Sequence, residues 1–301
     1  MTFKCIFCKK KKQRKIEENI KDYEFKVAGS YSYLQCIHCE LISLSPFPSL
    51  KDLKKFYPNN YISYLENSKK KGIIYYVLEK IYNFIYLKKL KKEIKIDSNL
   101  LDVGGGNGDF LINVSNSNSK LYSIDFNKIV CEIAKKKGVN SYCGFFLDYS
   151  EDKKFDYIFM NHYLEHVIDP MQELKKAFKI LKKSGRILGI MPNFYSWDQK
   201  IFGKYWGGNH VPRHTYQYSP KVLKKMLLKC GFVNIDIKYD INPAHLVLSI
   251  QNLLYRNKQN QLVNGRSSMY NILLIMLFPI NLIFKIFKKS GIMTFIAAKN
   301  L

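Results

Sequence analysis

Acidic residues are scarce in this chain: its 301 residues include 24 Asp and Glu against 49 Lys and Arg, for a formal net charge of +25. So large an imbalance indicates either a basic face for an anionic partner or lysines spread over the whole surface. Lys, Asn, Ile and Tyr are abundant together, which favours a general drift in composition. An anionic membrane or acidic ligand is the next interpretation, and nucleic acid is the least favoured.

Long uninterrupted apolar runs are also missing. No N-terminal stretch has the apolar core of a signal peptide, so we expect a cytoplasmic protein. The stretch NILLIMLFPINLIFKIFKK (271–289) is interrupted by Pro279, Asn281 and Lys285, and it is too short for a membrane span of ~20 residues. Its apolar positions and trailing lysines fit a helix on an anionic membrane surface, a substrate lid or core helix, or a dimer contact.

Disulfides are not expected from the seven cysteines, because the expected compartment is reducing. Four of them form two CxxC pairs, Cys5 and Cys8 in CIFC and Cys36 and Cys39 in CIHC. Two such pairs supply the four thiolates that surround one tetrahedral zinc ion. His38 lies between the second pair and is interpreted as an exposed residue. The pattern therefore predicts a structural zinc site, in preference to incidental or redox-active cysteines.

A glycine-rich stretch, LDVGGGNGDF (101–110), combines a short apolar strand, a tight turn and a helix start near Asp109. Three glycines have GxGxG spacing and a fourth lies between them; they are Gly104, Gly105, Gly106 and Gly108. Glycine adopts positive φ readily and lets a ligand approach the backbone, and a helix start presents free N–H groups to that ligand. Asp102 precedes the turn, where a carboxylate suits a ligand with an ammonium group or ribose hydroxyls.

A second strand, in LYSIDFN (121–127), ends at Asp125, 21 residues after Gly104. An acidic residue at this spacing is typical of a site that binds ribose hydroxyls. The GxGxxG spacing of a dehydrogenase is absent.

Taken with Asp102, the glycine turn resembles motif I of the class I S-adenosylmethionine-dependent methyltransferases. The segment KFDYIFMNHYLEHVIDP (154–170) resembles their fourth strand and the helix that follows it, and ILKKSGRILGIMPN (180–193) resembles the next helix and strand. RHTYQYSPKVLKKMLLKCGF (213–232) resembles a segment of the bacterial branch that acts on sugars, lipids and other small molecules. The resemblance spans roughly residue 100 to the C-terminus. The paired CxxC motifs resemble a zinc-binding module attached to some bacterial methyltransferases.

The resemblance implies an α/β, Rossmann-like fold with a mostly parallel seven-stranded sheet, helices on both faces, and a small N-terminal zinc-knuckle module. We expect the zinc-knuckle module over residues 1–60 and a linker over 61–95, with a helix over 72–92. The methyltransferase domain should span 96–301, with a helical insertion at about 242–290 between two edge strands that form an antiparallel hairpin. Ser49 should cap a short helix through Phe56. The tyrosines at 57, 61 and 64 should lie near the entrance to the catalytic domain. The resemblance implies that this segment can fold over the cofactor, and plain packing is the alternative role for each tyrosine.

Ligands in such a sheet bind beyond the carboxyl ends of the strands. Phe126 is expected to pack on the adenine, Asp148 to approach its amino group, and Asn161 to lie near the sulfonium. The complete set of expected cofactor-binding residues is Asp102, Gly104, Gly105, Gly106, Gly108, Asp125, Phe126, Asp148 and Asn161.

Methyl transfer from a sulfonium requires alignment and, for some acceptors, removal of a proton. The candidate general bases are His214, which we prefer, His162 and His166. Two alternatives remain for His166: it packs against its helix, or it joins Glu165 in binding a divalent metal.

The segment 192–220 is dense in aromatic residues and histidine, which is typical of a recognition loop. Its expected substrate-binding residues are Trp206, His210, Arg213 and Tyr218. Arg213 could hold a phosphate or carboxylate in bidentate fashion. The alternative is that Arg213 and His214 attach the loop to the domain.

The predicted function is therefore S-adenosylmethionine-dependent methylation of a small molecule or glycan, such as a surface-polysaccharide or lipid-linked sugar precursor, on oxygen, nitrogen or carbon. A peripheral position at the inner face of the cytoplasmic membrane would agree with a lipid-linked sugar substrate. The alternative enzyme is a quinone-like or other lipid O-methyltransferase. The alternative without catalysis is a basic, zinc-containing nucleic-acid-binding protein with a vestigial cofactor fold, which the intact glycine turn and Asp125 disfavour.

Overall fold

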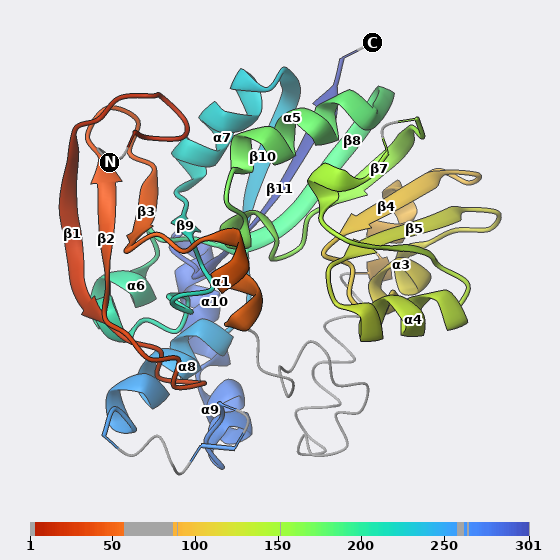
Figure 1. The fold of residues 1–301 in the computed structure, drawn as a ribbon. Coiled ribbons are helices and arrows are strands. Elements are labelled where there is room, and N and C mark those ends of the chain that lie inside the picture. Colours follow the sequence, from red (N-terminus) through yellow and green to blue (C-terminus); the bar gives the residue numbers. More distant parts are fainter. Residues whose placement is uncertain are drawn as a thin grey trace.

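The computed structural model describes residues 4–56, 87–88, 90–150, 152–257, 262–263 and 265–300. The tyrosines expected near the entrance to the catalytic domain, Tyr57, Tyr61 and Tyr64, lie outside the described residues, as does most of the helix expected over 72–92. Residues 87–88 and 90–93, at the end of that range, are helical. The described chain forms two sheets that lie side by side (Figure 1).

The larger sheet has seven strands in the order β10-β11-β8-β7-β4-β5-β6. β4, β5, β6, β7 and β8 pair in parallel, whereas β11 pairs antiparallel with both β8 and β10. The strands are β4 (Asn99–Val103), β5 (Lys120–Asp125), β6 (Asn140–Cys143), β7 (Phe155–Phe159), β8 (Leu181–Pro192), β10 (Phe232–Asp240) and β11 (Ile292–Lys299). This confirms the predicted Rossmann-like sheet and its antiparallel edge hairpin.

Helices cover both faces of this sheet (Figure 1). Successive residues of β4 alternate between two cores: Leu101 and Val103 pack with one set of helices, and Leu100 packs with the other. The first set is α5 (Pro170–Ile180) and α7 (Pro220–Lys229), and the second includes α3 (Asp109–Val114) and α4 (Lys128–Lys136). A strand buried on both sides in this way is typical of a parallel sheet.

Side-chain caps set where α4 and α7 begin. The Asn127 side chain accepts hydrogen bonds from the backbone N–H groups of residues 129 and 130 at the start of α4, and the Ser219 side chain accepts one from Val222 at the start of α7. Short 3-10 turns occupy Phe146–Asp148, Leu164–His166 and Gly203–Tyr205. The chain from β7 to α5 therefore contains an irregular stretch, and Asn161 lies in a turn after the end of β7.

The smaller sheet is antiparallel, with order β1-β2-β3-β9. Its N-terminal strands are β1 (Gln13–Ile20), β2 (Tyr31–Cys36) and β3 (Ile42–Ser45), and the fourth, β9 (Tyr216–Gln217), comes from the segment before α7. The cysteine pairs share one core with α7, since Cys5 and Cys36 belong to the same buried cluster as Leu223. The N-terminal module is thus built onto the methyltransferase-like domain by a strand and a core.

The described residues of the insertion between β10 and β11 form three helices, α8 (Ala244–Leu254), α9 (Tyr270–Met276) and α10 (Phe278–Ile286). α8 packs against α9 and against α6 (Trp197–Phe202). The 271–289 stretch therefore forms two short helices that meet at Leu277. Within the described residues, no helix has the length and apolarity needed to cross a bilayer.

Candidate active site

The glycine turn connects β4 to α3 in a conformation that requires glycine. Gly104, Gly106 and Gly108 have φ of 77°, 53° and 80°, in the left-handed region. Gly105 has no room for a side chain, because an added Cβ would lie 3.0 Å from the Asp102 Cβ and 3.1 Å from the Ser123 Cβ. The turn is held to the next strand by the N–H of Gly104, which donates to the Ile124 carbonyl at 2.8 Å.

Two carboxyl groups lie next to this turn. Asp125 ends β5, and its oxygens accept hydrogen bonds from the N–H of Gly106 at 3.2 Å and of Asn127 at 2.9 Å. Asp102 is 3% exposed, and burial together with the nearby Asp125 raises its pKa to about 8. Burial also raises the pKa of Asp125. Burial makes it unfavourable for these two acids to ionise. A positively charged or hydroxyl-bearing ligand would offset this effect, because it supplies charge or hydrogen-bond donors to the carboxylates.

A cavity of about 540 Å³ opens at the carboxyl ends of the parallel strands, beside the glycine turn. Of the expected cofactor-binding and catalytic residues, it brings together Gly104, Asp125, Phe126, Asp148, Asn161, His162 and His166. The remaining residues of the turn and Asp102 support the wall without lining the cavity. A ligand at this place fits the rule that open α/β sheets bind at the carboxyl ends of their strands.

Aromatic side chains form one end of the cavity. Phe126 and Phe145 are nearly parallel, with ring centroids 6.2 Å apart and an interplanar angle of 26°. Asp148 is exposed at the rim, on the turn that follows Phe145. Flat apolar faces beside a carboxylate suit an adenine ring and its amino group.

The other end of the cavity carries polar residues from the turn after β7. His162 adopts a positive φ of 49°, and its N–H donates to the Ile190 carbonyl at 2.7 Å. Its imidazole Nδ1 lies 3.3 Å from Oε1 of Glu165, whose side chain is 1% exposed, whereas the His162 side chain is 46% exposed. His166 lines the cavity as well, and burial lowers its pKa to about 4, so its ring is neutral near pH 7.

His214, the base preferred from the sequence, does not line this cavity. It is buried behind His166, with ring centroids 4.5 Å apart, and its Nδ1 lies 2.9 Å from the Gly208 carbonyl oxygen. Burial lowers its pKa well below the usual range. His210 lies 5.0 Å from His214 between ring centroids and pairs with Glu24 at 3.0 Å.

The other residues expected to bind substrate have a different role in this structure. Trp206, Arg213 and Tyr218 are at most 1% exposed. The Trp206 Nε1–H donates to Asp198 at 3.0 Å, and the Tyr218 hydroxyl donates to the Leu164 carbonyl at 3.0 Å. Their partners are protein groups because the segment 192–220 packs between the two sheets. This corresponds to the alternative in which the segment is attached to the domain.

Arg213 makes the strongest of these attachments. Its guanidinium donates to both carboxylate oxygens of Asp22, at 2.9 and 3.3 Å, and the two side chains are 0% and 1% exposed. The positive charge that could have bound a substrate anion is therefore neutralised by the N-terminal module.

Replacing Arg213 with alanine is expected to lower the free energy of unfolding by about 3–5 kcal/mol, because it leaves a buried carboxylate without its cation. Urea denaturation measures this. The control is Lys221→Ala, which removes the exposed ion pair with Glu40 and should cost less than about 1 kcal/mol. Equal effects of the two substitutions would contradict the assignment.

Several residues that line the cavity were not among the expected site residues, and they include Leu50, Leu53 and Glu173. Leu50 and Leu53 come from α1 (Leu50–Lys55), which Ser49 caps as expected, so the N-terminal module forms part of the cavity wall. Tyr163 and Glu173 line it too, and the Tyr163 hydroxyl donates to Glu173 at 3.1 Å. Burial raises the pKa of Glu173 to about 8.

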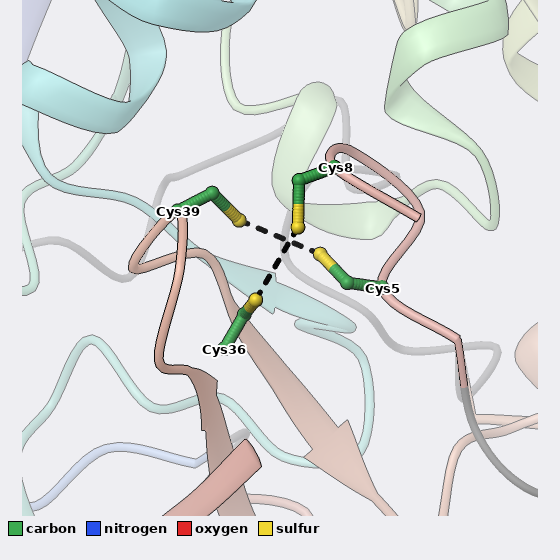
Figure 2. Close-up of side chains that lie close together, drawn as sticks. All are labelled: Cys5, Cys8, Cys36 and Cys39. Atoms are coloured by element: carbon green, nitrogen blue, oxygen red, sulfur yellow. Dashed lines mark hydrogen bonds between the residues drawn. The ribbon is translucent and has the colours of Figure 1, made fainter. Parts of the chain in front are cut away.

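The four paired cysteines converge at one point in the N-terminal module, and Figure 2 shows their sulfurs directed toward one another. Sγ of Cys5 lies 3.5 Å from that of Cys39, and Sγ of Cys8 lies 3.4 Å from that of Cys36. Contact with Cys39 lowers the pKa of Cys5 to about 5. Tetrahedral zinc with Zn–S bonds of about 2.3 Å separates its sulfurs by about 3.8 Å. The cluster is consistent with a zinc site after shifts of a few tenths of an ångström.

Comparison with known proteins agrees with this geometry. The family model described as "Methyltransferase domain" matches residues 72–237, more than half of the chain. A demethylmenaquinone methyltransferase from Staphylococcus saprophyticus is 24% identical over 181 residues, which cover 50% of this chain and 78% of that protein.

Among solved structures, phosphoethanolamine N-methyltransferase 2 from Haemonchus contortus, bound to S-adenosyl-L-methionine, matches with a TM-score of 0.50 and 15% identity over 73% of this chain. That match spans about half of the nematode chain, 53%. The same enzyme with phosphomonomethylethanolamine and S-adenosylhomocysteine matches with a TM-score of 0.52 and 15% identity, over 96% of this chain and 71% of that one.

At 15% identity the structural likeness shows the fold. Together with the family match and the glycine-turn geometry, it shows that the chain belongs to the methyltransferase-domain family and is a class I S-adenosylmethionine-dependent methyltransferase.

Proposed function

We propose that the enzyme methylates a hydroxyl group of a small molecule or glycan, with the acceptor bound at the His162 end of the cavity. The observation that carries this proposal is that different kinds of residue line the two sides of the cavity. Asp125 and Phe126, which are suited to the nucleoside end, are at the end of β5, whereas the half-exposed imidazole of His162 follows β7, and β4 lies between these two strands in the sheet. Bound S-adenosylmethionine supplies an activated methyl group on a sulfonium.

Specific residues would hold that cosubstrate. Asp125 would accept hydrogen bonds from the ribose hydroxyls, Phe126 would pack on the adenine, and Asp102 with the glycine turn would face the amino-acid end. The buried acids with raised pKa values favour a ligand that carries positive charge. Leu50 and Leu53 of α1 would exclude water from the reacting end.

His162 is our choice for the general base among the three histidines. It lines the cavity, and the buried Glu165 carboxylate beside its Nδ1 would orient the ring and stabilise the imidazolium that forms on proton uptake. His166 has a pKa of about 4 and is a weaker base, and His214 has no place on the cavity wall.

Methyl transfer from radiolabelled S-adenosylmethionine to a panel of nucleotide sugars, lipid-linked glycans and quinols tests the proposal. His162→Gln should lower kcat about a hundredfold with at least one acceptor while the Kd for S-adenosylmethionine stays within about twofold, because a positioned base typically contributes that much. The control is His38→Gln, in the N-terminal module. Undiminished turnover in His162→Gln would refute the assigned base, and transfer to none of these acceptors would refute the substrate class.

A second candidate acceptor is a quinone-like lipid at an anionic membrane surface. The curated relative acts on demethylmenaquinone according to its name. In this chain, α9 and α10 present exposed apolar side chains, including Ile272, Met276, Ile286 and Phe287, and Lys288 and Lys289 follow them. An exposed apolar face next to lysines is suited to the interface of an anionic bilayer.

Vesicles containing phosphatidylglycerol are expected to bind the protein, and Ile286→Glu combined with Phe287→Glu should weaken that binding about tenfold, because two apolar side chains no longer enter the bilayer. Cosedimentation measures it. Ile129→Glu on α4 is the matched control, since Ile129 and Ile286 are both 68% exposed. An equal loss of vesicle binding in the control would show that α10 has no specific role in that binding.

A further inference from the structure

Five of the six histidines of the chain gather behind the acceptor end of the cavity. His166 and His214 are 4.5 Å apart between ring centroids, His210 lies 5.0 Å from His214, and His245 lies 6.2 Å from His210. His162 joins this group through Glu165. Methyl transfer with one base does not require so many imidazoles.

Three members of this group offer a compact set of ligand atoms. One ligand atom each from Glu165, His166 and His214 lies within 4.8 Å of the other two. The two segments that carry them are fastened together: the Thr215 N–H donates to the Glu165 carbonyl at 2.7 Å, and the Tyr218 hydroxyl donates to the Leu164 carbonyl at 3.0 Å. These hydrogen bonds therefore hold the two segments, and the three side chains on them, together in the packed interior.

The imidazoles are oriented as metal ligands usually are. His166 Nδ1 lies 3.2 Å from the Arg213 carbonyl oxygen, and His214 Nδ1 lies 2.9 Å from the Gly208 carbonyl oxygen. A carbonyl oxygen only accepts, so each Nδ1 carries the hydrogen and each Nε2 keeps its lone pair. A histidine that binds a metal typically donates its other N–H to a backbone carbonyl or carboxylate in this manner.

The environment of the buried Glu165 carboxylate indicates a bound cation. Its residue is 0% exposed, and neither carboxylate oxygen accepts a hydrogen bond from any residue that the structure describes. His162 approaches Oε1 at 3.3 Å from the cavity side. A buried carboxylate normally requires hydrogen bonds or a cation to offset the loss of hydration.

We propose that Glu165, His166 and His214 bind a divalent zinc ion at the wall of the cavity, separate from the four-cysteine cluster. Two imidazole nitrogens and one carboxylate oxygen form a ligand set known from catalytic zinc sites, in which a fourth position stays open. The ligand atoms would draw together to about 3.3 Å around zinc, given bonds of about 2.0 Å. Because His166 lines the cavity, the open position borders the place assigned to the acceptor.

One role of the ion rests on the proposed function. A zinc ion beside the acceptor would bind its hydroxyl oxygen and lower the pKa of that hydroxyl, so that His162 removes the proton more readily. Zinc binding itself needs neither S-adenosylmethionine nor an acceptor, and it can be measured without them.

Zinc content of the full-length protein, purified in zinc-containing buffer and then dialysed, tests the proposal by mass spectrometry of the metal. We expect two zinc ions per chain in the wild type and one in Glu165→Gln, which keeps the size of the side chain and removes its charge. Glu173→Gln is the matched control, because it neutralises another buried carboxyl group on the cavity wall, and it should retain two. Circular dichroism establishes that each variant is folded.

Cobalt substitution gives a second readout should Glu165→Gln fail to fold. Cobalt bound by four thiolates gives strong near-ultraviolet charge-transfer bands and strong visible bands, whereas a site with nitrogen and oxygen ligands adds only weaker visible bands. The spectrum of the wild type minus that of His214→Gln should therefore contain visible bands alone, and the thiolate bands of the two proteins should be equal. One zinc ion per wild-type chain, or two in both Glu165→Gln and His214→Gln, would overturn the second site, whatever the methyl-transfer assays show.

Discussion

Asp125→Ala is expected to weaken binding of S-adenosylmethionine and S-adenosylhomocysteine about a hundredfold. Asp125 lines the cavity at the end of β5, where its carboxylate already orders the glycine turn by accepting from Gly106 at 3.2 Å. Hydrogen bonds to a charged acceptor contribute about 1.5–3 kcal/mol each. Loss of those to two ribose hydroxyls therefore removes about 3 kcal/mol, or roughly two orders of magnitude in Kd. Isothermal titration calorimetry measures the change.

Glu132→Ala provides the matched control for this experiment. Glu132 is a carboxylate on α4, half exposed and paired with Lys135 at 3.0 Å, away from the residues that line the cavity. Its removal should leave the Kd within about twofold, since exposed ion pairs contribute little. Micromolar binding that survives in Asp125→Ala would mean that the nucleoside end of the ligand lies elsewhere.

Cys36→Ser is expected to remove the zinc of the four-cysteine cluster and to lower Tm by about 10 °C. Cys36 is 0% exposed, and the cluster shares its core with α7 of the methyltransferase domain. Structural zinc contributes its binding energy to folding, and for a chain of this size each kcal/mol corresponds to about 2–4 °C. A loss of several kcal/mol thus gives the expected shift in Tm, which differential scanning calorimetry measures, and mass spectrometry of the metal measures the zinc content.

Cys143→Ser is the comparison for that variant, because Cys143 is an exposed cysteine outside the cluster. It should keep the wild-type zinc content and a Tm within about 1 °C of it, as most surface substitutions do. A Cys36→Ser protein with unchanged zinc content and Tm would show that the four thiols pack together without a metal.

The cavity was predictable because most of its cofactor side depends on short-range patterns. A glycine turn needs a few contiguous residues, and Asp125 follows from the length of one helix and one strand after it. The recognition loop was not predictable in this way. Arg213 read alone is a cation available to substrate, but its partner Asp22 lies 191 residues earlier in the chain. Trp206 and Tyr218 are likewise buried by strands that the loop meets only in the folded protein.

The choice of the general base among the three histidines also depends on contacts between residues that are distant in sequence. Spacing placed His162 and His166 near the end of a strand and His214 in the aromatic-rich segment, and the composition of that segment led to the preference for His214. Packing puts His162 on the cavity wall beside Glu165 and buries His214 behind His166, although 47 residues separate His166 from the Arg213 carbonyl that orients it. The site therefore combines residues whose order in the chain carries no information about their distance.

The sequence by itself determined the order of strands and helices, the glycine turn with its two acids, and the pairing of four cysteines, because each depends on local conformation or fixed spacing. Only the tertiary structure decided that β9 completes the N-terminal sheet, that α1 forms part of the cavity wall, and that Glu165 meets two imidazoles in the interior. Those relations depend on which apolar faces are buried against one another, and burial is a property of the whole folded chain.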